Sequence, residues 1–223
     1  MFQGYNQETF EFFMAIRFNN NRAFFQENRD WYLRAVREPS LALTDALAGI
    51  IEDIDPEMDR RGHKVVSRIN RDIRFSKDKS PYRDHVWLSF RRPDEERGKS
   101  PSIYFEVNDE YAAYGMGFYQ DNRQLMDGLR RQMAADPDQM MALLAPLQDF
   151  DLFTVPNSRI KPPEDLPAGL RSWYCARSFY FSRDILDFDL IRSPELATEL
   201  EQGFLRMKPL YRHIREILDA VQG

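Results

Sequence analysis

The part of the chain best equipped for chemistry runs from Arg68 to Tyr82 and reads RINRDIRFSKDKSPY. We call Arg68–Tyr82 the basic segment, because it holds three arginines and two lysines against two aspartates. An arginine guanidinium binds phosphate or carboxylate through two parallel hydrogen bonds, and a lysine adds a point charge. The basic segment therefore predicts a site for an anionic ligand, with phosphorylated compounds among the candidates.

Particular side chains have distinct roles in this hypothesis. The residues expected to bind the anion are Arg68, Arg71, Arg74 and Lys79 and, from a later helix, Arg123. The residues expected to take part in catalysis are Asp72, Asp78 and Tyr82. Either aspartate could orient an arginine, bind a metal or act as a base, and the tyrosine hydroxyl could donate to the ligand. These residues leave open whether the protein is an enzyme or a binding protein. They indicate no cofactor and no metal-ligand set.

The same charges also allow a structural explanation. Asp72 and Asp78 could pair with the arginines in an ion-pair lattice that fixes the turn. The protein would then be an interaction or scaffold protein. The two hypotheses predict different geometry: a ligand site places the guanidinium groups on a concave, open surface, whereas a lattice hides them against the two aspartates.

The conformation of the basic segment is left open by its spacing. In a helix, Arg68, Arg71 and Arg74 would share one face. In a strand, Arg68 and Arg74 would share a face while Arg71 lay on the other. Asp78 and Ser80-Pro81 favour a turn near the end of the segment.

The distribution of charge restricts the expected partners. The chain has 223 residues and a net charge of −5, yet residues 60–84 carry +6 and the rest carries −11. An acidic body repels the phosphate backbone, so nucleic-acid binding is not expected, whereas a local anion pocket is compatible with this pattern. The sequence does not indicate the oligomeric state.

Composition is that of an ordinary globular protein. Apolar residues make up 43% of the chain, which is enough for one core, so we expect a single domain over residues 1–223. The one cysteine, Cys175, excludes an intramolecular disulfide and favours a reducing compartment, so we expect a cytoplasmic protein. No apolar run is long enough for a membrane span, and the acidic start at Glu8 and Glu11 is not typical of a signal peptide.

Two other motifs predict structure rather than chemistry. Gly115 and Gly117 begin a G-x-G pattern that fails at Gln120, so we expect them to relieve crowding in a hairpin. Ser76 and Lys79 have the S-x-x-K spacing of some acyl enzymes, but a proline that follows at once disfavours the helix this chemistry needs.

The histidines and the cysteine show no spacing typical of a metal or catalytic site. His63, His85 and His213 are too far apart in the sequence for a metal motif, and we expect them at the surface or at strand ends. Cys175 is predicted to be a small buried apolar residue.

Helical spacing dominates the first 55 residues. A helix is predicted after an N-cap at Asn6, a second after a cap among Asn19, Asn20 and Asn21, and a third from Pro39 to the breaker Asp55-Pro56. The apolar stripe expected on the first helix contains Phe10, Phe13, Met14 and Phe18, with Phe12 and Ile16 on a second apolar face.

Alternation of apolar and polar residues replaces helical spacing in the middle of the chain. It predicts strands at 85–91, 103–107 and 111–118, whose short connections require antiparallel pairing. Helices are expected after Asp121 or Asn122 and after an N-cap at Asp136 followed by Pro137.

The last third is predicted to contain an irregular loop at 156–167, an aromatic strand at 172–182 and a long helix from Ser193-Pro194. The expected fold is therefore α+β, with a central antiparallel sheet packed by N-terminal helices and a long C-terminal helix.

The string RINRDIRFSKDKSPY resembles the signature of a family of uncharacterised, mostly bacterial proteins, domain of unknown function 2461. Five other stretches are similar to the same family: FQGYNQETFEFF, NNNRAFF, ENRDWY, YFEV and GMGFY. The resemblance is best over residues 2–135, although Phe24 stands where the family would have Trp. It implies a similar fold and a shared important segment that includes Phe75, and it implies no activity.

Overall fold

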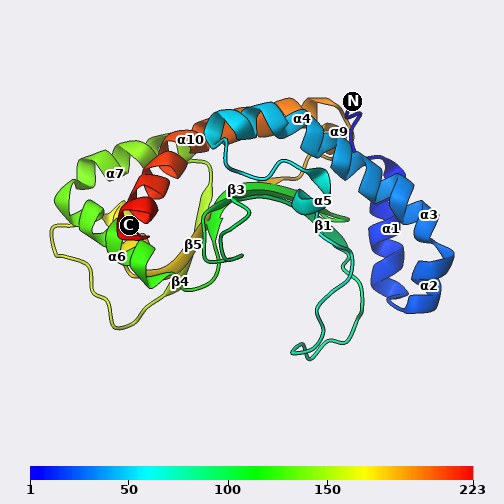
Figure 1. The fold of residues 1–223 in the computed structure, drawn as a ribbon, viewed down its shortest axis with the longest axis horizontal. Coiled ribbons are helices and arrows are strands. Elements are labelled where there is room, and N and C mark those ends of the chain that lie inside the picture. Colours follow the sequence, from blue (N-terminus) through cyan, green and yellow to red (C-terminus); the bar gives the residue numbers. More distant parts are fainter. Residues whose placement is uncertain (223) are drawn as a thin grey trace.

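The structure is a computed structural model that describes residues 1–222. Five antiparallel strands form one sheet in the order β1-β2-β3-β5-β4. The strands are β1 His85–Phe90, β2 Ser102–Asn108, β3 Ala112–Phe118, β4 Asp151–Pro156 and β5 Ala176–Ile185. Figure 1 shows the sheet as an arch, with α4 (Glu38–Ile54) and α10 (Glu195–Gln222) running over its convex side. The predicted α+β class, with an antiparallel sheet and a long C-terminal helix, is confirmed.

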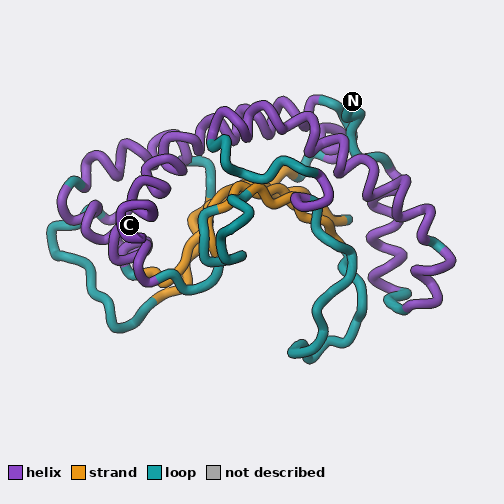
Figure 2. Tube along the Cα trace, in the orientation of Figure 1, coloured by secondary structure: helices purple, strands orange, loops and turns teal. Residues whose placement is uncertain are grey.

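Most other helices gather at the two ends of the arch (Figures 1 and 2). One end holds α1 Gln7–Phe18, α2 Arg22–Glu27 and α3 Arg29–Tyr32, and the other holds α6 Arg123–Ala135 and α7 Pro137–Leu144. The short helical elements are the π-helical η1 Leu33–Arg37, α5 Gly62–Val65, the 3-10 turn η2 Ala145–Leu147, α8 Ala168–Tyr174 and α9 Phe188–Ile191.

Short polar side chains begin the helices where the sequence predicts. The Asn6 side chain accepts a hydrogen bond from the backbone N–H of Thr9 at 3.1 Å. Asn21 caps α2 in the same way, as do Asn122 at α6 and Asp136 at α7. Each cap satisfies a donor that the first helical turn leaves unpaired, which is worth about 1 kcal/mol.

The sheet has one covered face and one open face. The cross-strand partners Leu88, Phe105 and Tyr114 are fully buried on the convex side, where α4 and α10 pack. Trp87 and Glu106 are also cross-strand partners. Each is next to Leu88 or Phe105 in its own strand, so its side chain points to the opposite, concave side. Figure 1 shows none of the described helices across that concave side.

The first helix is buried through its second apolar face more than through the expected stripe. Met14 and Phe18 are exposed, at 51% and 79%, so their predicted place in the core is wrong. The buried apolar residues of α1 are Phe10, Phe12, Phe13 and Ile16. Helical spacing fits both faces, and contact with Trp31 and Tyr32 decides between them, because both rings pack against Phe12.

The second and third predicted helices are joined rather than separate. The chain is helical through α3, η1 and α4, and Pro39 lies in the first turn of α4, as predicted. Because proline has no N–H, the Ala35 carbonyl lacks its usual helical donor. It accepts a hydrogen bond from the Thr9 hydroxyl of α1 at 2.6 Å instead. This bond and the wider π-helical turn accommodate the proline without ending the helix.

Two predictions for the second half need correction. No strand was predicted at β4, whose residues are exposed or half-buried at the sheet edge, so their apolar alternation is weak. The strand predicted at 172–182 starts too early, because residues 172–174 belong to α8, where Leu170 and Trp173 are buried one turn apart. The loop predicted at 156–167 does lie between β4 and α8.

The closing helix packs as its sequence predicts. Its fully buried stripe consists of Leu196, Leu200, Phe204, Met207, Tyr211, Ile214 and Leu218. Pro209 lies within α10, which continues beyond it. Among the described helices, none combines the length and the apolar character needed to cross a membrane.

Candidate anion-binding site on the concave face

The basic segment is an extended loop that is pinned at both ends. The Arg71 N–H donates to the Pro81 carbonyl at 2.9 Å, and the Arg83 N–H donates to the Ile69 carbonyl at 2.8 Å. Figure 1 shows this loop, in the blue-green that precedes β1, extending beside the concave side of the sheet; Figure 2 shows that it contains neither helix nor strand.

Burial along the loop follows the extended alternative and not the helical one. Arg71 is half-buried, whereas Arg68 and Arg74 are exposed, as expected when they point to the opposite side of an extended chain. The Asp78 carboxylate accepts the Ser80 N–H at 2.9 Å, which forms the predicted turn.

The two aspartates of the basic segment pair with its arginines. Asp72 accepts two hydrogen bonds from Arg74, at 2.9 and 2.7 Å, and Asp78 pairs with Arg71. Hydrogen bonds from Arg74 lower the pKa of Asp72 to about 2, and those from Arg71 and Ser80 hold the pKa of Asp78 well below its ordinary range. The pairing is what the lattice hypothesis expects. The Arg74 side chain is 76% exposed, however, whereas the lattice hypothesis expects hidden guanidinium groups.

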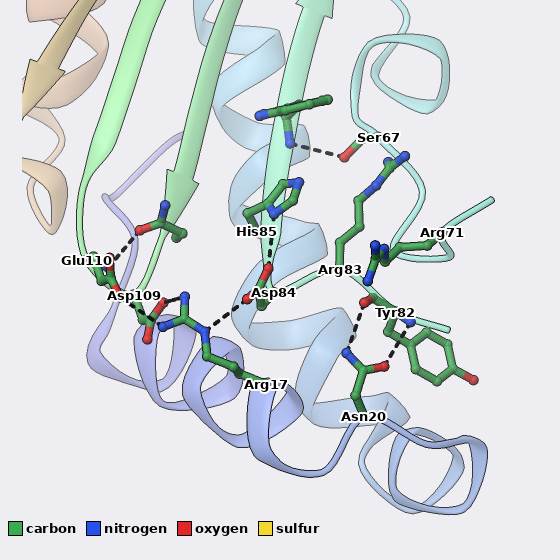
Figure 3. A network of polar contacts seen from close by, with 12 residues as sticks. Arg17, Asn20, Ser67, Arg71, Tyr82, Arg83, Asp84, His85, Asp109 and Glu110 are labelled. Carbon is green, nitrogen blue, oxygen red and sulfur yellow. Dashed lines mark hydrogen bonds and ion pairs between the residues drawn. The ribbon is translucent and has the colours of Figure 1, made fainter. Parts of the chain in front are cut away.

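Tyr82 anchors the loop to the N-terminal helices. Its ring is buried and stacked on Phe25, with the ring centroids 4.4 Å apart. The side chain of Asn20 accepts the Tyr82 N–H at 2.9 Å and donates to the Tyr82 carbonyl at 3.0 Å (Figure 3). The Asn20 amide therefore supplies the two hydrogen bonds that a neighbouring strand would otherwise make with the Tyr82 backbone.

Of the residues expected to bind or react, only Arg123 lies elsewhere. It is exposed at the start of α6, where its guanidinium is 3.5 Å from Asp127. Lys79, by contrast, remains within the loop and donates to the Ile73 carbonyl at 2.9 Å. Figure 1 shows α6 and the basic segment at opposite ends of the arch.

A cavity of about 270 Å³ lies on the concave face of the sheet, and its walls contain no residue of the basic segment. Its walls come from β1, β2, β3, β5 and the loop between β1 and β2, and they include Trp87, Arg97, Tyr104, Glu106, Tyr119 and Tyr180. Aromatic walls with a few polar groups are typical of sites for small molecules.

Two glycines of β3 make room for the cavity floor. Tyr104 crosses over Gly115 and donates its hydroxyl to the Phe181 carbonyl at 3.2 Å. A Cβ atom at Gly115 would lie 2.9 Å from this hydroxyl and 1.8 Å from the carbonyl oxygen. Gly117 has a φ of +147°, a conformation that side chains other than glycine rarely adopt. The prediction that these glycines relieve crowding is confirmed.

Arg83 connects the basic segment to the cavity. Its guanidinium lies 5.8 Å from the centre of the Trp87 ring, and it donates to the Arg68 carbonyl at 3.1 Å. Burial and the positive charges of Arg97 and Arg71 lower the pKa of Arg83, and Figure 3 shows Arg71 beside it. Within residues 1–222, no carboxylate lies within ion-pair distance of this guanidinium.

Arg83 and Arg97 are not among the site residues predicted from the sequence. A signal existed for Arg83, because Arg83, His85 and Trp87 alternate and share the face of an extended chain that points to the concave side. No comparable signal existed for Arg97, which reaches the cavity only through the path of the β1–β2 loop.

A second polar network stands at the start of β1 (Figure 3). Arg17 of α1 donates to Asp84 at 2.9 Å, to Asp109 at 2.6 Å and to Glu110 at 3.0 Å. The other oxygen of Asp84 lies 3.1 Å from Nδ1 of His85. Burial alone would raise the pKa of Asp84, but the hydrogen bonds from Arg17 and His85 outweigh it and lower that pKa. Asp84 is therefore ionised at neutral pH, and Nδ1 of His85 is the donor in this pair.

Glu106 is the carboxyl group within the cavity wall. It stands opposite Trp87 in the register of β1 and β2, and its side chain is half-buried. Burial raises its pKa. A carboxyl group with a raised pKa can hold and release a proton nearer to neutral pH than an ordinary glutamate.

The site therefore combines an unneutralised guanidinium, an aromatic wall and two groups suited to proton transfer. Over residues 1–222, no three His, Cys, Asp or Glu side chains are grouped as a metal site would require. The polar groups suit an anion, and the rings suit a planar part of the same molecule.

The chain matches the model of one protein family over most of its length. The model of a family described as conserved hypothetical protein (DUF2461) matches residues 8–213. A search of the curated proteins finds no match to the chain.

Proposed function

The chain belongs to the DUF2461 family, whose description names no activity, and we propose a function from the site itself. The protein binds a small anionic ligand, such as a phosphorylated compound, in the cavity on the concave face. The observation that carries this proposal is the position of Arg83, half-buried between two other arginines and without a carboxylate among the described residues.

Electrostatics supports an anion at this point. Gathering the guanidinium groups of Arg71, Arg83 and Arg97 costs free energy, because like charges repel and burial removes water from Arg83. Arg71 is paired with Asp78, whereas Arg83 has only a carbonyl acceptor. A bound phosphate or carboxylate would relieve the repulsion and accept the remaining N–H donors.

The surroundings also support a ligand with more than an anionic group. Trp87, Tyr104 and Tyr180 contribute to the wall of the cavity, and the Tyr104 and Tyr180 rings lie 6.5 Å apart, edge to face. These rings would cover the apolar or planar part of a molecule whose anionic group is held by Arg83. The exposed Arg68 and Arg74 extend the positive field along the loop and would attract the ligand.

Thermal-shift measurements with inorganic phosphate, sulfate, nucleotides, sugar phosphates and carboxylates test the proposal. A ligand that binds only the folded protein raises Tm, since it adds about 2.7 kcal/mol of stability at a hundred times its Kd. We expect at least one class of anion to stabilise the wild type. We expect Arg83→Gln to weaken its binding roughly 10-fold or more, because a hydrogen bond to a charged group is worth about 1.5–3 kcal/mol.

The matched control is Arg123→Gln, which removes an exposed arginine at the other end of the arch. It should leave the ligand response unchanged. The proposal would be abandoned if no anion raised the Tm of the wild type, or if Arg83→Gln and Arg123→Gln responded to the anion alike.

The alternative is an interaction or scaffold protein in which the basic segment is a structural ion-pair lattice. The pairs Arg71–Asp78 and Arg74–Asp72 favour it. This alternative predicts that Arg71→Ala lowers Tm sharply and that anions have no effect. The anion proposal predicts a folded Arg71→Ala variant with a weakened ligand response.

A further inference from the structure

A histidine–carboxylate pair stands next to the proposed ligand site. His85 precedes Trp87 by two residues on β1, so both side chains point to the concave side. Their ring centroids are 5.1 Å apart. Because Arg83 lies 5.8 Å from the same Trp87 ring, a ligand held by Arg83 beside Trp87 also lies near His85.

We infer that His85 is the general base of a reaction on the bound anion, with Asp84 and Arg17 as the residues that position it. The inference rests on the proposed function, since it requires a ligand at Arg83. It goes further, because it makes the protein an enzyme whose reaction begins by removing a proton from a hydroxyl group of the ligand or from water.

Geometry fixes the ring in the form that this role needs. The Asp84 carboxylate is held by Arg17 at 2.9 Å and accepts the Nδ1–H of His85 at 3.1 Å. The neutral ring then carries its proton on Nδ1, which leaves the lone pair of Nε2 free. Figure 3 shows the second ring nitrogen pointing away from Asp84, toward the side on which Arg83 lies.

The proton transfer is balanced within the described residues. A hydroxyl proton passes to Nε2 of His85, and the electron pair of the O–H bond stays on the oxygen, which becomes the nucleophile. The imidazolium that forms is stabilised by the negative charge of Asp84. Glu106, whose pKa burial raises, is the group in the cavity wall suited to return a proton during the reaction.

The charged groups around Asp84 and His85 suit the positioning of the pair by Arg17. Arg17 binds the carboxylates of Asp84, Asp109 and Glu110, and so stands behind the pair on the side of α1. That arrangement orients Asp84 toward His85, whereas an isolated surface carboxylate would move freely.

Nitrogen-15 NMR of the histidine rings, with inorganic phosphate as the probe, tests the inference. The described histidines are His63, His85 and His213, so His63 and His213 serve as controls in the same spectrum. We expect neutral His85 to carry its proton on Nδ1, and we expect phosphate to shift its Nε2 resonance. Asp84→Asn should shift the neutral ring toward the Nε2–H form. If Asp84 only stabilised the fold, Asp84→Asn would leave the tautomer of the neutral His85 ring unchanged.

Arg83→Gln separates this inference from the proposed function. It should abolish the phosphate-dependent shift of Nε2 while the neutral His85 ring keeps its proton on Nδ1. If phosphate stabilises the wild type through Arg83 but leaves Nε2 unmoved, or if the neutral ring is protonated on Nε2, the inference is wrong and the proposed function stands. If none of the anions in the thermal-shift measurements stabilises the wild type and phosphate does not shift Nε2, both are wrong.

Discussion

Arg83 and Glu106 are both held in surroundings that disfavour their charge. The arginine stands among other arginines, and the glutamate is half-buried in an aromatic wall. Such positions lower the stability of the folded protein, and proteins retain them where a ligand or a reaction compensates. At the scale of the residue, the site is therefore marked by two charged groups, Arg83 and Glu106, whose charge the surrounding residues do not stabilise.

Glu106→Gln should therefore stabilise the folded protein at neutral pH. The folded pKa is raised above the ordinary glutamate value of about 4.3, so the cost of ionisation is present at pH values above the folded pKa. We expect a gain of roughly 0.5–2 kcal/mol in the free energy of unfolding at pH 7. The gain should shrink as the pH falls toward about 4, where the carboxyl group is protonated in both states.

Urea titrations at several pH values measure this difference. The exposed Glu11 provides the control, since Glu11→Gln should change stability little at any of them. A loss of stability in Glu106→Gln at pH 7 would show that the carboxylate of Glu106 makes a favourable interaction in the folded protein.

At the scale of the element, the basic segment depends on contacts with the N-terminal helices. Its polar sequence supplies few apolar anchors, and the loop is joined to the rest of the protein by the backbone bonds at its two ends, the buried Ile69 and the contacts of Tyr82. Asn20 supplies both side-chain bonds to the Tyr82 backbone from the turn between α1 and α2. The position of the segment beside the cavity is therefore set by residues 62 positions away in the sequence.

Removing this clamp should loosen the basic segment. Asn20→Ala leaves the Tyr82 N–H and carbonyl without partners in a partly buried position, which costs about 1–3 kcal/mol. We expect a lower Tm and faster tryptic cleavage within Arg68–Lys79. Limited proteolysis with mass spectrometry locates the cuts.

The neighbouring substitution Asn19→Ala is the matched control, because the Asn19 side chain bonds only to the Ala15 carbonyl of its own helix. Equal cleavage of the two variants would mean that Asn20 does not hold the segment.

At the scale of the whole molecule, the arch separates stability from binding. The convex side of the sheet carries the core beneath α4 and α10, and the concave side carries the cavity (Figure 1). Positive charge is concentrated at one place beside that cavity, while the rest of the chain has an excess of acidic residues. This distribution suits a small anion and not a long polyanion.

Double-stranded DNA should therefore bind poorly. The basic segment could contact a few phosphates, but the acidic remainder would repel the rest of the backbone. We expect no measurable binding of a labelled duplex by fluorescence anisotropy at about 0.15 M salt, where the Debye length is about 8 Å. Tight duplex binding that Arg83→Gln leaves intact would contradict this expectation and would identify a basic surface outside the cavity.

The sequence by itself determined the class of fold and most of its elements. Polar caps such as Asn6 and Asn122, the alternation in β1 and the stripe of α10 are local patterns, because each reflects bonds or burial within one element. The sequence also predicted an anion site at the basic segment, since a cluster of arginines can be seen in the sequence alone.

Only the tertiary structure decided that Arg83 stands without a carboxylate. Arg71 and Arg74 find partners within their own loop, whereas Arg83 lies between Trp87 and the charge of Arg97 from another loop. The link from Arg17 to His85 through Asp84, the buried face of α1 and the edge strand β4 were likewise invisible in the sequence. Each depends on contacts between elements, and neither residue spacing nor local propensity contains that information.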